Sequence, residues 1–138
     1  MHIAIDPHSP VPIYQQIRDC VVEMIAAGEL RTGERLVSIR GLAGQLGVNI
    51  ETVYKAYDLL RNDGFLITND KSGSRIVSGL DRADMTIEDL PEGWSARFRV
   101  LVAEALATGL SSRGLNHEVE NTVTEFLNRQ RASGLSSA

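Results

Sequence analysis

The sequence lacks several features on which whole classes of protein depend. It has one cysteine, Cys20, among 138 residues, so no disulfide can form within the chain. No apolar run approaches the roughly 20 residues that a membrane-spanning helix needs, and the N-terminus has neither the basic nor the apolar block of a secretion signal. We therefore expect a cytoplasmic protein with no membrane partner, in which Cys20 is a core residue rather than a reactive thiol.

Patterns typical of catalysis and of metal binding are also missing. The three histidines, His2, His8 and His117, are scattered, with no Asp, Glu or Cys at ligand spacing around them, so we expect no metal site. The sequence has no glycine-rich phosphate loop, no His-Glu-x-x-His pair, and no Ser or Cys nucleophile with a plausible base. We expect neither a cofactor nor an enzymatic activity.

Positive charge is in short supply. Lys and Arg total 14 against 18 Asp and Glu, which gives a net charge of −4, whereas many DNA-binding domains are strongly basic. Because nonspecific DNA binding comes mainly from the neutralisation of phosphates, this composition predicts weak nonspecific binding. It does not exclude specific DNA binding, which would depend on a local arrangement of the contact residues. Otherwise the composition, 43% hydrophobic and 23% charged, is that of an ordinary globular protein.

The first half of the chain shows three helical patterns followed by a hairpin pattern. Apolar residues recur at helical spacing, and the short second helix begins after a Ser cap and ends at a Gly. A short helix, a glycine turn and a longer helix have the spacing of a helix-turn-helix, and a hairpin directly after it is a wing. We expect helices over 12–27, 39–46 and 49–62 or 63, a very short strand at 35–37, and hairpin strands at 65–68 and 74–77.

Two further amphipathic helices follow an acidic linker. Their apolar stripes run from Trp94 to Leu106 and from Leu115 to Leu127. We expect the two stripes to face each other and to leave an outer apolar surface, which favours a twofold dimer. The alternative is that these helices pack back onto the first helix within a monomer. The predicted dimer interface consists of Trp94, Phe98, Leu101, Val102, Val119, Val123, Phe126 and Leu127.

The order and wording of these parts resemble the GntR family of bacterial regulators. The matching segments are Pro12-Ile-Tyr-Gln-Gln-Ile17, Gly28 to Leu36, Ser38-Ile-Arg-Gly-Leu-Ala43, Leu46-Gly-Val48, Thr52 to Tyr57 and Leu60 to Phe65. The Val53-Tyr-Lys-Ala-Tyr57 segment and the short C-terminal part are similar to the YtrA subfamily. The sequence departs from the family pattern at three positions. The family often has Pro at the position of Val37, Arg or Pro at that of Ile50, and Gly at that of Lys71.

The resemblance implies a winged helix-turn-helix with a two-helix dimerisation tail. The expected fold is mostly α with a small β-wing. We expect a DNA-binding domain over 1–78, a linker over 79–91, a helical dimerisation domain over 92–132 and a disordered tail over 133–138.

A recognition helix presents its N-terminal residues to base edges in the major groove. Glu51 would accept from cytosine N4, and Asn49 would read adenine or serve only as a cap. Arg40 lies where the family uses an arginine for DNA contact, although it would instead pair with Glu51 or Glu23 if its role were structural. The predicted DNA-binding residues are Ser38, Arg40, Asn49, Glu51, Thr52, Tyr54, Lys55, Lys71, Ser72, Gly73 and Arg75.

Several of these residues have structural alternatives. In these alternatives to DNA contact, the Thr52 hydroxyl would be hydrogen-bonded within its own helix. Tyr54 would pack on the wing, and Lys71 would be a solvated turn residue. Four aromatic residues are expected in the core or at an interface: Tyr14, Tyr57, Phe65 and Trp94.

The expected function is that of a sequence-specific transcriptional regulator that binds a palindromic operator as a homodimer. We expect a repressor, because repression needs only occupancy of a promoter site. The small helical domain leaves little interior volume for a ligand, so we expect weak or absent effector binding. One alternative is a winged-helix protein-interaction module that does not bind DNA, which the net negative charge and Ile50 favour. Another is an RNA-binding winged helix.

Overall fold

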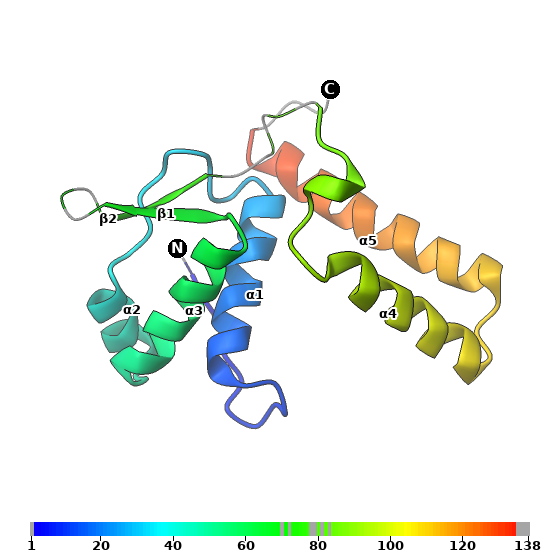
Figure 1. The fold of residues 1–138 in the computed structure, drawn as a ribbon, viewed down its shortest axis with the longest axis horizontal. Helices are drawn as coiled ribbons and strands as arrows, with labels where there is room; N and C mark the ends of the chain where they lie inside the picture. Colours follow the sequence, from blue (N-terminus) through cyan, green and yellow to red (C-terminus); the bar gives the residue numbers. More distant parts are fainter. Residues whose placement is uncertain are drawn as a thin grey trace. The chain divides into compact units, whose positions relative to one another are not determined.

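The computed structural model describes residues 2–69, 71, 73–77, 80, 82 and 84–134. The chain divides into two compact units, one ending at Ala83 and one beginning at Asp84. Figure 1 shows three helices and a hairpin in the first unit and two longer helices in the second. The elements are α1 (Ile13–Ala26), α2 (Ile39–Leu46), α3 (Ile50–Asn62), β1 (Leu66–Asn69), β2 (Gly73–Ile76), the 3₁₀ turn η1 (Ile87–Asp89), α4 (Trp94–Thr108) and α5 (Ser112–Ala132).

Local capping fixes the ends of the helix-turn-helix. The Ser38 hydroxyl accepts a hydrogen bond from the Gly41 N–H at 3.0 Å and so starts α2. Gly47 ends that helix in the left-handed region, with φ 68°, a conformation that glycine adopts without steric cost. The Asn49 side chain then accepts from the Glu51 N–H at 2.8 Å and starts α3. Ser38 therefore sets where α2 begins, and Gly47 and Asn49 set the turn between α2 and α3.

The wing is an antiparallel hairpin extended by a third segment. Leu66 pairs with Ile76 at its base, and Asn69 pairs with Gly73 near its tip. The expected short strand at 35–37 is present as an isolated bridge between Arg35 and Arg75, supported by a 2.8 Å bond from the Leu36 N–H to the Ser74 carbonyl. Both hairpin strands lie one residue away from their expected bounds.

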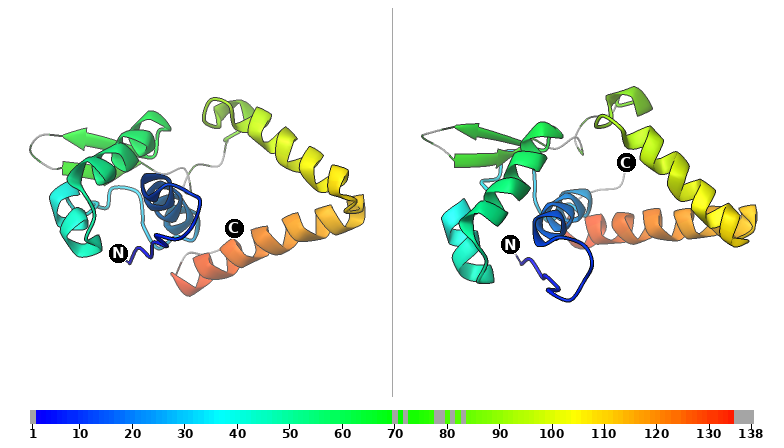
Figure 2. Two further views of the ribbon diagram at one scale, coloured as in Figure 1. Left: turned by 90° about the horizontal axis from the view of Figure 1, so that it is seen from below. Right: turned by 60° about the horizontal axis from the view of Figure 1, so that its bottom comes forward.

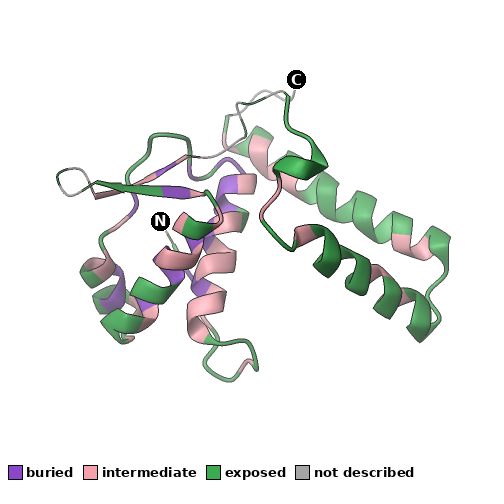
Figure 3. Ribbon diagram, in the orientation of Figure 1, coloured by how far each residue is buried: buried purple, intermediate pink, exposed green. Residues whose placement is uncertain are grey.

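The apolar core lies in the first unit, where the buried residues gather in Figure 3. Tyr57 of α3 is the largest fully buried side chain, and its hydroxyl donates to the Val37 carbonyl ahead of α2. Burial raises the pKa of Tyr57, so the phenol stays protonated in the folded chain. Cys20 is half-buried and packs against this core. The other fully buried large side chains are Ile17, Val21, Leu42, Val53, Leu60 and Ile76.

The second unit has a different character, because neither α4 nor α5 contains a buried residue. Figure 2 shows the two helices diverging from the turn that joins them. The expectation that their apolar stripes face each other is therefore wrong for the single chain. A second difference lies in the expected linker, part of which forms η1, because Thr86 and Asp89 cap each other's backbone N–H groups.

Replacing Tyr57 by Phe should lower the free energy of unfolding by about 1 kcal/mol, because the Val37 carbonyl loses its donor. Urea denaturation measures the change. Tyr54→Phe is the matched control: Tyr54 is half exposed, so its loss of a hydroxyl should change stability by less than about 0.5 kcal/mol. Equal effects of the two substitutions would contradict the importance of the buried hydrogen bond.

Candidate nucleic-acid interface

Helix α3 has one buried side and one outward side. Val53, Ala56, Tyr57 and Leu60 are buried against the rest of the first unit, and Figure 1 shows α3 lying between α1 and α2. Spacing of one and four residues places the exposed positions of the first two turns together on the opposite side. We refer to these exposed positions, Ile50, Glu51, Tyr54 and Lys55, as the outward side of α3.

Arg40 stands in the first turn of α2 and is exposed. Among the ion pairs of the described residues, none joins Arg40 to Glu51 or Glu23. The structural alternative for Arg40 therefore has no support, and its guanidinium remains available for a ligand.

Two predicted contact residues already have a structural task. The Ser38 hydroxyl and the Asn49 amide oxygen are the caps of α2 and α3. Asn49 was expected either to read adenine or to cap, and the structure shows the cap. Its amide nitrogen and the Ser38 hydroxyl hydrogen are the groups left to donate.

Helix α1 orients Lys55, whose ammonium group lies 4.1 Å from the centre of the Tyr14 ring. This cation–π contact holds the long side chain while Lys55 stays exposed. Thr52, one turn earlier, is half-buried.

Tyr54 is linked to the wing through Arg61. The Arg61 guanidinium lies 5.7 Å from the centre of the Tyr54 ring and donates to Thr68 of β1 at 3.3 Å. The Asp58 carboxylate, 2.8 Å from the same guanidinium, raises the pKa of Arg61. Tyr54 nevertheless remains 50% exposed, so packing on the wing and contact with a ligand are compatible.

The wing carries a basic residue that sequence reasoning missed. Arg35 lies against Gly73 so closely that a Cβ on that glycine would come within 3.1 Å of the Arg35 Nε. Lys71 is exposed near the tip, and Ser72 lies outside the described residues. Arg75 is half-buried and donates to the Gly33 carbonyl at 2.9 Å, so it braces the base of the wing. The expected strand at 35–37 was the signal that would have placed Arg35 beside the hairpin.

Comparison with known proteins identifies the family to which this arrangement of helices and wing belongs. Residues 13–76 match the model of the gntR family of bacterial regulatory proteins. YtrA from Sulfolobus acidocaldarius, a GntR-family transcription factor of known structure, is 41% identical with a TM-score of 0.60, over 76% of this chain and 97% of that one. The chain belongs to the GntR family. The prediction of a mostly α winged helix-turn-helix, similar to YtrA, is confirmed, as is the prediction of a transcriptional regulator rather than an enzyme.

Other relatives of this GntR chain cover different shares of its length. The transcriptional regulator Rv1152 of Mycobacterium tuberculosis is 32% identical over 109 residues, which is 79% of this chain and 84% of the relative. A transcriptional antiterminator from Listeria monocytogenes has a TM-score of 0.79 and 25% identity, over 91% of this chain and 92% of that one. The chain spans only 16% of the pyridoxine biosynthesis regulator PdxR of Corynebacterium glutamicum, which it matches at 40% identity over 74 residues.

Charge is unevenly divided along this GntR chain. Residues 1–83 carry nine Arg and Lys against ten Asp and Glu, and residues 84–138 carry five against eight. Most of the net negative charge therefore belongs to the second unit. In the first unit, Asp63 and Asp19 pair with Arg18, which reduces the acidity available to repel a phosphate backbone.

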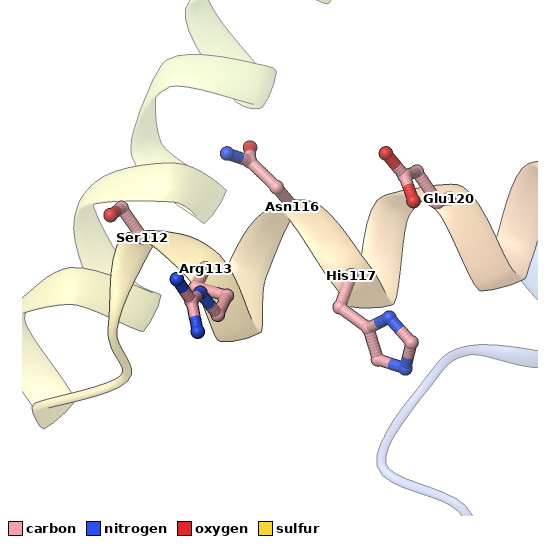
Figure 4. A pocket seen from close by; sticks show the side chains of 5 residues that line it. All are labelled: Ser112, Arg113, Asn116, His117 and Glu120. Atoms are coloured by element: carbon pink, nitrogen blue, oxygen red, sulfur yellow. The ribbon is translucent and has the colours of Figure 1, made fainter.

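The second unit has open hollows that are each lined by a single helix. One lies on α4, lined by Phe98, Arg99, Val102, Ala103 and Leu106, and another lies on α5. Ser112, Arg113, Asn116, His117 and Glu120 line it (Figure 4) and all come from that one helix. Ligand sites bury most of a small molecule's surface between several elements, so neither hollow gives a reason to assign an effector. Among the described residues, no helix has the length and apolarity to cross a membrane.

Replacing Arg35 by Ala should lower the salt dependence of duplex binding by about one unit of log–log slope, as expected for the loss of one phosphate contact. Fluorescence anisotropy titrations at several salt concentrations measure this slope. Arg113→Ala on α5 removes the same charge from the other unit and should leave the slope unchanged. A slope unaltered by Arg35→Ala would remove Arg35 from the interface.

Proposed function

We propose that this GntR-family chain binds a palindromic operator as a homodimer in the cytoplasm and represses transcription from it. The observation that carries the proposal is the outward side of α3, where four exposed positions lie on one side of the helix. Arg40 of the preceding helix is exposed as well and has no ion pair among the described residues. A helix inserted N-terminal end first into the major groove uses these positions to contact base edges. Membership of a family of bacterial regulatory proteins supports the same role.

Each part of the site has a proposed contact. Glu51 accepts from a cytosine N4 amine, and Arg40 forks onto a guanine or a phosphate. Lys55, held by Tyr14, binds a phosphate beside the groove. Thr52 and the caps Ser38 and Asn49 donate to phosphates of the DNA backbone. The wing residues Arg35, Lys71, Ser72, Gly73 and Arg75 follow the backbone or the minor groove.

Dimerisation is proposed from the exposed apolar residues of the second unit. Leu101 is 63% exposed and Val123 is 51% exposed, although both belong to apolar stripes. Trp94 and Phe98 stack with ring centres 5.1 Å apart, which forms a broad apolar surface at the start of α4. A second copy would cover these stripes and complete a four-helix core. The proposed interface comprises Trp94, Phe98, Leu101, Val102, Val119, Val123, Phe126 and Leu127.

A dimer with two identical reading helices requires a symmetric site. Repression needs no further domain, because occupancy of a promoter site is enough.

An experiment that tests the function selects bound sequences from random duplex DNA with the full chain and then measures mobility shifts at two salt concentrations. The proposal predicts an enriched inverted repeat whose binding weakens steeply with salt. Failure to retain any duplex at low salt would refute it.

Replacing Arg40 by Ala should cost about 1–3 kcal/mol of specific binding. Arg40→Lys keeps the charge but loses the bidentate fork, so it should recover only part of the loss if the arginine reads a guanine. Isothermal titration with the selected duplex measures both variants. Wild-type affinity in Arg40→Ala would exclude a contact by this residue.

Replacing Leu101 by Asp should produce monomers, because a charge within an apolar interface cannot be buried without a partner. Sedimentation velocity gives the oligomeric state, and operator affinity should fall with it. Ala96→Asp places the same charge on the other side of α4, where Ala96 is exposed, and should leave the dimer intact. A stable dimer of the Leu101→Asp variant would disprove this interface.

A further inference from the structure

An isoleucine stands exposed where the outward side of α3 begins. Ile50 is the first residue of the helix, is 46% exposed and lies outside the apolar core cluster. β-branched residues are weaker helix formers than Ala or Glu, and an apolar side chain that is nearly half exposed gains only part of the free energy of burial. The fold therefore gives no reason for an isoleucine at this position, although a single exposed apolar residue is not unusual in itself.

The polar groups around Ile50 leave few ways to read a base. The Asn49 amide oxygen is engaged as the helix cap, and the first two turns of α3 contain no arginine, a residue that often reads guanine. Their one cation, Lys55, is proposed above to bind a phosphate. The Glu51 carboxylate can only accept, so cytosine N4 is the donor that it fits. Ile50 itself has no polar group in its side chain, so apolar contact is the form of base recognition open to it.

Tyr54 extends this apolar contact along the helix. It lies one turn after Ile50 on the same side and is also half exposed. The two side chains lie above one another, since they are four residues apart on a helix, and Glu51 follows Ile50 on the same exposed side. The base edge that suits such a surface is one that carries an apolar group.

We propose that Ile50 reads the 5-methyl group of a thymine in the major groove, beside the base pair that Glu51 contacts. This inference rests on the proposed function, in which α3 enters that groove. Among the four bases, thymine alone presents a methyl group there. Contact between the methyl group and Ile50 removes apolar surface of both from water.

The test replaces thymines of a bound duplex by uracil, one position at a time. Uracil keeps every hydrogen-bonding group of thymine and lacks only the methyl group. The full chain should lose about fourfold in affinity at one thymine of each half-site, the change expected for one buried methyl-sized group. Fluorescence anisotropy measures the dissociation constants of each duplex.

Two variants tie the effect to the side chain. Ile50→Ala should bind the thymine and uracil duplexes equally, because the group that senses the methyl is gone. Val11→Ala is the control: Val11 is an exposed β-branched residue ahead of α1, with 40% exposure, and its loss should leave the discrimination at fourfold. Ala is a good helix former, so Ile50→Ala should fold, which circular dichroism checks.

Each outcome has a distinct meaning. Discrimination by wild type that disappears in Ile50→Ala supports the inference. A duplex that binds equally well with uracil at every position, or an Ile50→Ala variant that still discriminates, overturns it and leaves the proposed function standing. Failure of the wild-type chain to bind any duplex overturns the proposed function itself.

Discussion

The buried side of α3 is the constraint on which the rest of the structure depends. Val53, Ala56, Tyr57 and Leu60 are fully or almost fully buried, and they fix the rotation of the helix between α1 and α2. Because a helix turns 100° per residue, burying these positions forces Ile50, Glu51, Tyr54 and Lys55 outward. The same core also supports the wing through Ile76 of β2. Packing and recognition are thus two consequences of one apolar pattern.

The electrostatics of the chain are compatible with a duplex partner because charges are arranged locally. The net charge of −4 belongs mostly to the second unit, and Arg18 neutralises Asp63 within the first. Arg35, Arg40, Lys55 and Lys71 are exposed around α2, α3 and the wing. Few cations imply weak nonspecific binding, so in the proposed function the discrimination between DNA sites comes from base contacts.

The sequence predicted those parts of the structure that local chemistry decides. Ser38 and Gly47 specify the two ends of α2, which has the bounds that they indicate, and Asn49 caps the start of α3. Contacts between distant segments were harder to foresee. The position of Arg35 against Gly73 depends on a third segment pairing with the hairpin. The divergence of α4 and α5 depends on the turn between them, and apolar periodicity within each helix carries no information about that angle.

The most direct test of the central claim is a map of backbone amide chemical shifts during titration with an operator duplex. If the outward side of α3 enters the groove, the largest changes fall at residues 49–55, at the first turn of α2 and along the wing. Changes confined to α4 and α5, or a spectrum that duplex DNA leaves unaltered, would contradict the account.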